Sequence, residues 1–202
     1  MSELIDHYDK LIDEGNDPTK DSPELREYMD KWDGERFIRS MQLDKSKSVL
    51  EIGVGTGRLA IRVAPFCKSF FGIDISPKTI ERAHKNLISL NNVRLVCGDF
   101  ITFEFNEKFD VIYSSLTFMH VEDKKSAIEK VASMLNDNGV FVLSIDKNQD
   151  GFIDMGTRKI KVYPDDPSDI CRFIREAKLK LTEQFETDHA YVTVGKKAFP
   201  LT

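Results

Sequence analysis

The residues best suited to chemistry begin at Glu51, an acid that ends an apolar run and precedes three alternating glycines, Gly53, Gly55 and Gly57. Glycines at this spacing let the backbone turn sharply after a strand and let a ligand lie against it. A carboxylate beside a pyrophosphate is repelled, whereas a carboxylate beside a cationic ligand is stabilised. The segment therefore predicts a cofactor-binding loop, and Glu51 favours a cofactor that carries positive charge.

Two other ligand classes compete for this loop. A nucleotide-triphosphate loop needs a Lys and a Ser or Thr directly after its last glycine, but Arg58 and Leu59 occupy those positions. The dinucleotide fingerprint needs its third glycine at position 58, and here that glycine comes one residue early, at Gly57. A nucleotide triphosphate is therefore excluded as the ligand, and the dinucleotide fingerprint matches only in part.

Two further acids follow the next two predicted strands. Asp74 lies at the end of the apolar run 70–75, just before Ser76-Pro77, a pair that favours a helix start. It falls about twenty residues after the glycines, where a carboxylate accepts hydrogen bonds from ribose hydroxyls. Asp99 follows the strand predicted at 93–97, and taken alone it is typical of a solvated turn.

The pattern Glu-x-Gly-x-Gly-x-Gly after an apolar strand resembles the first motif of the class I S-adenosylmethionine-dependent methyltransferases. The acids after the following strands match later motifs of that family, and the resemblance extends over about residues 49–197. It implies that Asp74 binds the ribose, that Asp99 accepts from the adenine amine, and that Ile75 and Phe100 pack on the base. The cofactor-binding residues that it implies are Glu51, Gly53, Gly55, Gly57, Asp74, Ile75, Asp99, Phe100 and Ser115.

The acceptor side corresponds to the segment 114–120, which follows the strand predicted at 109–113. Many N-methyltransferases carry a tetrad here: Asn or Asp, then Pro-Pro, then Tyr or Phe. This chain lacks the tetrad, which argues against an amide or the exocyclic amine of a nucleic-acid base as substrate. His120 is the candidate catalytic base, because the unperturbed pKa of histidine lies near neutrality. A structural role in the loop competes with this one. We expect a small-molecule acceptor, with the methylated atom undetermined.

The predicted fold is α/β, with a Rossmann-like, seven-stranded, mostly parallel sheet and helices on both faces. Near-continuous apolar strands alternate with helices between residues 49 and 143, as in a sheet that is covered on both sides. A short turn joins the strands predicted at 179–185 and 191–194, and this spacing indicates a C-terminal antiparallel hairpin. Residues 46–202 are expected to form the cofactor-binding domain.

Residues 1–45 are expected to form a helical lid over the cofactor. Their apolar and aromatic residues recur at helical spacing, and Tyr8, Tyr28, Trp32 and Phe37 are the candidates for covering the site. Ordinary packing of amphipathic helices on the sheet explains each of these residues equally well.

Composition limits the remaining function classes. The chain has 202 residues, 41% hydrophobic content and a formal charge of -5, which fits one globular domain and argues against nucleic-acid partners. It contains no apolar run long enough for a membrane span and no signal-peptide pattern, so a cytoplasmic protein is expected. Cys67, Cys97 and Cys171 are expected to be buried thiols. The oligomeric state is not indicated.

The segment from Asp146 to Asp154 matches the first nine positions of an EF-hand calcium loop, but the twelfth position is Thr157 instead of a bidentate Glu. A strand also precedes it where an EF-hand has a helix. We therefore expect no metal, and a polar loop beside the active site in which Asp146 contacts substrate. Two alternatives to an active methyltransferase stay open: a catalytically silent S-adenosylmethionine-binding module and a nicotinamide-dependent oxidoreductase.

Overall fold

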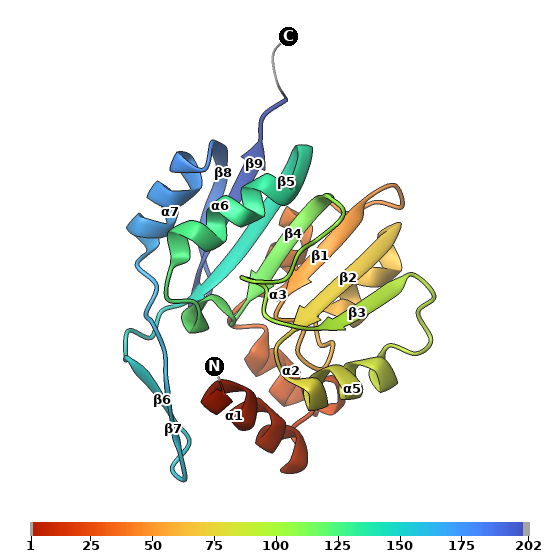
Figure 1. The fold of residues 1–202 in the computed structure, drawn as a ribbon, viewed down its shortest axis with the longest axis vertical. Helices are drawn as coiled ribbons and strands as arrows, with labels where there is room; N and C mark the ends of the chain where they lie inside the picture. The colour runs from red at the N-terminus through yellow and green to blue at the C-terminus, as the bar shows by residue number, and fades with distance from the viewer. Residues whose placement is uncertain (1, 200–202) are drawn as a thin grey trace.

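A computed structural model describes residues 2–199 and shows a central sheet flanked by helices (Figure 1). The sheet has seven strands in the order β3-β2-β1-β4-β5-β9-β8, and β6 and β7 pair separately. Strands β1 to β5 run parallel, whereas β9 is antiparallel to both β5 and β8, which confirms the predicted fold and hairpin. The strand bounds are β1 Ser48–Ile52, β2 Ser69–Asp74, β3 Val93–Cys97, β4 Phe109–Ser115, β5 Leu135–Asp146, β6 Phe152–Asp154, β7 Lys159–Lys161, β8 Leu179–Glu186 and β9 Ala190–Lys197.

Two apolar cores cover the two faces of the sheet, because successive strand residues point to opposite sides. In β1, Val49 packs in one core and Leu50 in the other, and both side chains are fully buried. The same alternation places Ile112 of β4 in the second core and Tyr113 in the first. Glu51 therefore shares a face with Tyr113, its register partner on the neighbouring strand.

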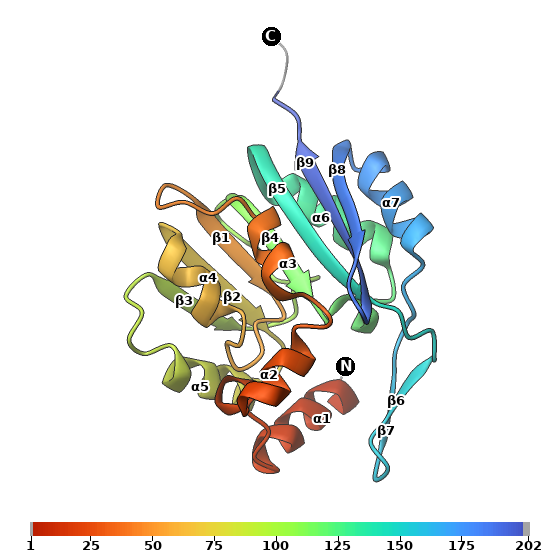
Figure 2. The same cartoon turned by 180° about the vertical axis from the view of Figure 1, so that it is seen from behind.

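Helices cover both cores, as Figures 1 and 2 show from opposite sides. Phe37 of α3, Ala60 of α4 and Ile80 of α5 pack in the core that contains Val49. Ile128 of α6 and Ile174 of α7 pack in the core that contains Leu50. The α-helices are α1 Ser2–Asp13, α2 Pro23–Met29, α3 Gly34–Ser40, α4 Ala60–Val63, α5 Pro77–Asn86, α6 Lys124–Met134 and α7 Pro167–Glu176, with short 3-10 helices at Pro18–Lys20, Ala64–Phe66 and Phe118–His120. No described helix is long and apolar enough to cross a membrane.

The N-terminal helices α1 and α2 lie at the edge of the sheet where strands β1, β2 and β4 end (Figure 1). Phe37 differs from the other aromatic lid candidates, because its side chain is fully buried and packs edge-to-face on Tyr113, with 6.0 Å between ring centroids. Phe37 is therefore a core residue of α3.

Two element boundaries and one cysteine need comment. Helix α4 is only four residues long, because Pro65 follows and the chain continues as a 3-10 turn. Strand β5 begins at Leu135, ahead of its continuous apolar run, and Asn138 adopts a φ of 62° within it. Cys97 is exposed at the end of edge strand β3, so its expected burial was wrong, whereas Cys67 and Cys171 are buried.

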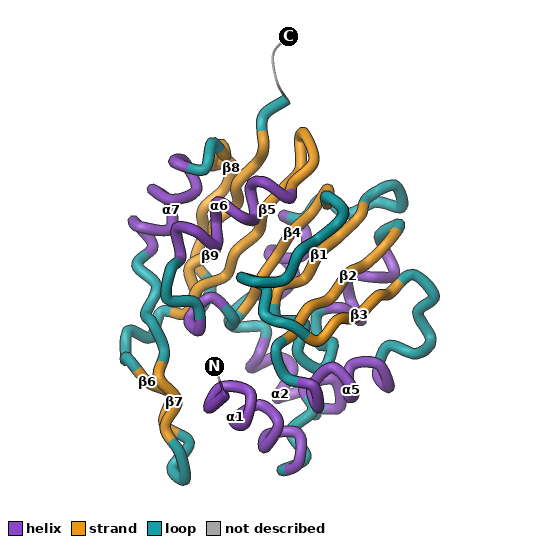
Figure 3. Tube along the Cα trace, in the orientation of Figure 1, coloured by secondary structure: helices purple, strands orange, loops and turns teal. Residues whose placement is uncertain are grey.

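A separate two-stranded hairpin, formed by β6 and β7, extends away from the main sheet (Figure 3). It follows β5, and its first strand is made of the last three residues of the segment expected to be a polar loop. Its backbone rejoins the domain where Tyr163 N donates to Met119 O at 2.7 Å. The hairpin therefore lies against the segment that follows β4.

Candidate active site

The glycine loop begins where β1 ends and uses backbone conformations that favour glycine. Gly53, Gly55 and Gly57 have φ angles of 78°, 55° and 99°. A Cβ atom on Gly53 would lie 2.0 Å from Thr117 Oγ1, whereas a Cβ atom on Gly55 would meet nothing within 4 Å. The loop thus packs tightly against the segment after β4 on one side and leaves open space at Gly55.

Asp74 ties the end of β2 to this loop. One carboxylate oxygen accepts from Gly55 N and the other from Ser76 N, each at 3.0 Å. Ser76 is also the N-cap of α5, since its hydroxyl accepts from Thr79 N. Burial raises the pKa of Asp74, and the backbone hydrogen bonds oppose that shift. The carboxylate oxygens keep lone pairs with which to accept further hydrogen bonds from a ligand.

Glu51 is a buried acid, with 3% of its surface exposed. Tyr113 donates its hydroxyl to Glu51 Oε2 at 2.8 Å, a contact that follows from the shared face and register of β1 and β4. Burial raises the pKa of Glu51 well above its usual range, although Tyr113 and Arg58 favour its ionised form. A cationic group bound nearby would stabilise the ionised form further.

Asp33 and Arg58 form a buried ion pair beside Glu51. Asp33 is the N-cap of α3 and accepts from Gly34 N at 2.7 Å. Arg58 donates to both oxygens of Asp33, and Ser115 Oγ donates to one of them at 2.8 Å. The side chain of Asp33 is fully buried, and 16% of the Arg58 side chain is exposed. The pair therefore joins the N-terminal segment, the glycine loop and the end of β4.

The residues predicted to surround the adenine also lie at this edge of the sheet. Ile75 directly follows β2 and is half-buried, and Gly98 N donates to Asp74 O at 2.8 Å, which brings the end of β3 to the same place. Asp99 is half-buried and accepts from Ile101 N at 2.9 Å. Phe100 is 6% exposed and belongs to the core cluster. Most of its ring thus packs within the domain.

His120 lies in the short 3-10 helix after β4 and contacts the N-terminal helix. Its Nε2 atom is 2.6 Å from the hydroxyl oxygen of Tyr8, and its buried Nδ1 atom has no hydrogen-bond partner among the described residues. Burial lowers the pKa of His120 to about 4, with smaller contributions from His7 and Lys124. The imidazole is therefore neutral near pH 7.

Helix α1 is anchored at two places around Tyr8. Asp9 accepts from Ser76 Oγ at 2.7 Å and from Lys78 N at 3.2 Å, at the start of α5. On the other side, Arg158 of the β6–β7 connection donates to both oxygens of Glu14, at 2.7 and 2.8 Å. The helix therefore bridges the start of α5, next to Asp74, and the hairpin.

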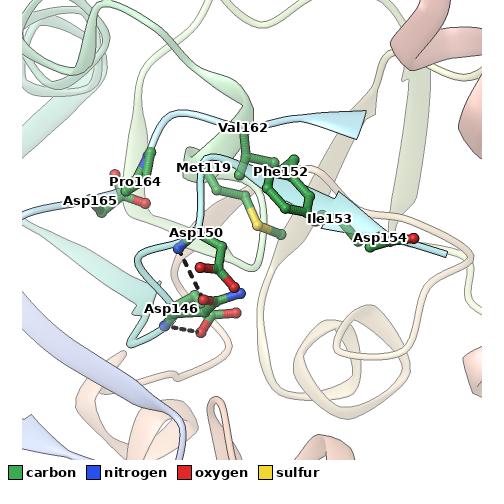
Figure 4. A pocket seen from close by; sticks show the side chains of 10 residues that line it. Met119, Asp146, Asp150, Phe152, Ile153, Asp154, Val162, Pro164 and Asp165 are labelled. Atoms are coloured by element: carbon green, nitrogen blue, oxygen red, sulfur yellow. Dashed lines mark hydrogen bonds between the residues drawn. The ribbon is translucent and has the colours of Figure 1, made fainter. Parts of the chain in front are cut away.

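An open cavity of about 410 Å³ lies between the end of β5, the hairpin and the segment after β4 (Figure 4). Its lining combines apolar and acidic side chains: Met119, Asp146, Asn148, Asp150, Phe152, Ile153, Asp154, Val162, Pro164 and Asp165. Asp146 lines this cavity and accepts from the indole nitrogen of Trp32 at 3.1 Å; its expected contact with substrate stays a prediction. Within residues 2–199, no group of three or more His, Cys, Asp or Glu side chains is arranged to hold a metal ion.

Local sequence did not identify the Asp33–Arg58 pair or the contact between Gly53 and Thr117. Asp33 before Gly34 is a recognisable helix N-cap, but nothing in the local pattern indicates which distant cation it pairs with. Tyr8 was expected only as one of several covering aromatics, and its bond to His120 spans 112 residues. These partners meet only once the sheet has formed.

The fold and the site together define a class of protein. The strand order with a reversed β9, the glycine loop after β1 and the acids at the ends of β1, β2 and β3 are those of the class I S-adenosylmethionine-dependent methyltransferases. Residues 43–188 match a family of methyltransferase domains. The chain belongs to this family, which confirms the resemblance seen in its sequence.

Individual relatives agree with this assignment. An uncharacterised methyltransferase of Anoxybacillus flavithermus is 36% identical over 122 residues, and the match covers 58% of this chain and 56% of that protein. The chain thus aligns with little more than half of that relative's length. The fold is similar to a crystal structure of the N-methyltransferase NodS from Bradyrhizobium japonicum with S-adenosylhomocysteine, with a TM-score of 0.66, 21% identity and coverage of 88% and 89%. A methyltransferase structure from Clostridium acetobutylicum aligns with a TM-score of 0.70, 18% identity and coverage of 98% and 99%.

Proposed function

We propose that this protein binds S-adenosylmethionine across the ends of β1 to β4 and transfers its methyl group to a small-molecule acceptor. The observation that carries this proposal is the convergence of the glycine loop, Glu51 and Asp74 at the edge of the sheet where the parallel strands end. The open cavity at the end of β5 lies at the same edge. The open space at Gly55 and the free lone pairs of Asp74 fit a ligand that lies along the loop.

The donor-binding residues in this proposal are those predicted from the sequence, joined by Asp33 and Arg58. Asp74 binds the ribose hydroxyls, while Ile75, Asp99 and Phe100 bind the adenine. Glu51 lies near the end of β1 and Ser115 at the end of β4, where the buried acids Glu51 and Asp33 favour the positively charged part of the cofactor. The sulfonium of the bound cofactor supplies an activated methyl group, so the protein contributes mainly proximity and orientation.

His120 is proposed to contact the acceptor. A neutral imidazole accepts a hydrogen bond or a proton, and the low pKa keeps His120 neutral throughout the physiological range. The same low pKa makes His120 a weak base while Tyr8 covers it. Orientation of the acceptor is therefore the larger part of its proposed role.

Residues 1–45 are proposed to act as a lid whose moving part is α1. Tyr8 is a residue of α1, and burial together with the nearby charge of Asp74 raises its pKa well above the usual value. Because α1 also contacts Ser76 through Asp9, entry of a cofactor to Asp74 is proposed to involve movement of Tyr8 and α1. Closure of α1 afterwards would exclude water from the site.

Calorimetric titration with S-adenosylhomocysteine tests the proposed donor site. We expect wild-type protein to bind, and Asp74→Ala and Glu51→Ala each to bind roughly 5- to 150-fold more weakly, the loss of a hydrogen bond to a charged group. Asp137→Ala is the matched control, because Asp137 is exposed near the start of β5, at the opposite edge of the sheet. Unchanged affinity in both site variants would place the cofactor elsewhere.

Two alternatives give different results in the same samples. A nicotinamide-dependent oxidoreductase would be stabilised against heat by NAD and not by S-adenosylhomocysteine. A silent binding module would bind S-adenosylhomocysteine normally but would transfer no methyl group to any acceptor. Transfer of a radiolabelled methyl group to a small-molecule acceptor would contradict both alternatives.

A further inference from the structure

The cavity beside Met119 has a charge pattern that the donor site does not explain. Of its four lining carboxylates, Asp165 pairs with Lys124 at 3.0 Å and Asp154 pairs with Lys159 at 3.2 Å. Asp150 has no ion pair among the described residues. Asp146 is held by a neutral donor, the indole of Trp32, at 3.1 Å. The cavity thus contains two carboxylates whose charge no side chain offsets.

Hydrogen bonds within the loop after β5 hold the carboxylate of Asp146 and the backbone of Asp150. Asn148 N donates to Asp146 Oδ1 at 2.8 Å, and Asp150 N donates to Asn148 Oδ1 at 3.0 Å. Figure 4 shows Asp146 and Asp150 on this loop, next to the Met119 thioether and the Phe152 ring. No Lys or Arg is among the described residues that line the cavity. Lys159, which pairs with Asp154, places its Nζ 4.4 Å from the centroid of the Phe152 ring, so one face of this ring already carries a cation. The groups left to attract an organic cation are the carboxylates of Asp146 and Asp150, and the apolar side chains beside them suit its hydrocarbon part.

Residues that are adjacent in the chain link the cavity to the proposed donor site. Trp32, which donates to Asp146, immediately precedes Asp33, and Asp33 accepts from Ser115. Met119, which lines the cavity, immediately precedes His120. A molecule in the cavity would therefore lie next to the segment from Ser115 to His120, the proposed acceptor side. The volume of about 410 Å³ lies in the range of small-molecule sites.

We propose that this cavity is the acceptor site and that it selects a small molecule with an amine, recognised as its ammonium ion by Asp146 and Asp150. The inference rests on the proposed methyltransferase function and narrows its acceptor class. The apolar surfaces of Met119, Phe152 and Val162 would contact the hydrocarbon part of the same molecule. Acceptors with a carboxylate or phosphate would be repelled.

Calorimetry on protein saturated with S-adenosylhomocysteine tests the proposal with probes of matched shape. The probes are 2-phenylethylamine, 2-phenylethanol and 3-phenylpropanoate, together with 1,4-diaminobutane as a purely aliphatic amine. We expect at least one amine to bind, and the alcohol and the carboxylate to bind at least tenfold more weakly. Absence of amine binding up to 10 mM, or equal binding of the carboxylate, would overturn the proposal.

Three variants locate the binding groups. Asp146→Asn and Asp150→Asn should each weaken amine binding by roughly ten- to a hundredfold, the loss expected for hydrogen bonds to a charged group. Asp150→Lys should reverse the preference toward 3-phenylpropanoate. Asp137→Asn is the distant control and should bind the amine as the wild type does. If Asp146→Asn, Asp150→Asn and Asp150→Lys all bind the amine as tightly as the wild type does, the site lies elsewhere.

The titration with S-adenosylhomocysteine separates the two levels of inference. If S-adenosylhomocysteine does not bind, the proposed function fails. If it binds and the amines do not, only the acceptor class fails. Mixing the saturated protein with 1 mM calcium provides a further check, because displacement of a bound amine by calcium would favour a metal loop at residues 146–154.

Discussion

Replacing Gly53 with alanine tests the tightest contact in the proposed donor loop. Gly53 has a φ of 78°, and its Cβ would lie 2.0 Å from Thr117 Oγ1 and 2.7 Å from Thr117 Cγ2. Gly55 has a similar φ of 55°, but its Cβ would meet nothing within 4 Å. The two glycines therefore share the conformational requirement and differ in steric surroundings, so that Gly55→Ala is a matched control.

The expected cost follows from two terms. A non-glycine residue in the left-handed region costs about 1–2 kcal/mol, and this term applies to both substitutions. Overpacking adds about 1–3 kcal/mol, and it applies to Gly53→Ala alone. We therefore expect Gly53→Ala to lower the free energy of unfolding by about 2–5 kcal/mol and Gly55→Ala by about 1–2 kcal/mol. For a domain of this size each kcal/mol corresponds to about 2–4 °C in Tm.

Urea unfolding followed by circular dichroism measures these differences, and a double-mutant cycle with Thr117→Ala identifies their source. Thr117→Ala removes the two nearest atoms and leaves the Thr117 Cβ at 2.8 Å. We expect this change to recover at least about 1 kcal/mol of the Gly53→Ala cost, within the usual range for contacting residues. Equal costs at Gly53 and Gly55, or additive effects of Gly53→Ala and Thr117→Ala, would refute the steric explanation.

Three further predictions concern the N-terminal segment. Asp33→Ala should lower the free energy of unfolding by about 3–5 kcal/mol in urea, because it leaves the mostly buried Arg58 without its main partner. Between pH 6.5 and pH 4 the free energy of unfolding of the wild type should fall by about 3 kcal/mol because of His120. In His120→Gln this fall should be absent. Arg158→Ala should speed amide hydrogen exchange in α1 severalfold and leave the central strands unchanged, since Arg158 joins the hairpin to Glu14.

The direction of the His120 effect follows from its depressed pKa. In the unfolded chain His120 takes up a proton below its ordinary pKa of 6.5, whereas in the folded protein it stays neutral down to about pH 4. Between these values the unfolded state binds more protons, so stability falls as the pH falls. Below about pH 4 the loss is complete and constant. Identical pH profiles for the wild type and His120→Gln would contradict the burial of this imidazole.

Controls distinguish these effects from general damage. Asp30→Ala removes a partner of Arg62 whose side chain is 38% exposed, and it should cost less than about 1 kcal/mol. An equally small cost for Asp33→Ala would mean that the Asp33–Arg58 pair is not buried in solution.

Glu14→Ala should reproduce the exchange pattern of Arg158→Ala, because it breaks the same ion pair from the other side. Unchanged exchange in α1 for both variants would contradict the anchoring role of this pair.

The sequence by itself determined the sheet, the glycine loop and the acids at the strand ends. Each is a local pattern: apolar runs form buried strands, and the carboxyl ends of parallel strands converge at one edge of the sheet. The sequence assigns Asp74 and the loop at Gly55 to the same predicted cofactor site, and in the structure Gly55 N donates to Asp74 at 3.0 Å. The short α4 was also foreseeable in principle, because Pro65 is visible in the sequence.

Only the tertiary structure decided which distant side chains meet around that edge. The pairing of Tyr8 with His120, of Asp33 with Arg58 and of Trp32 with Asp146 depends on how the N-terminal helices dock on the sheet. The β6–β7 hairpin likewise creates the acidic cavity by folding against the segment after β4. A local pattern specifies what each residue contributes, but the burial and pairing of a charge depend on partners that packing brings from far along the chain.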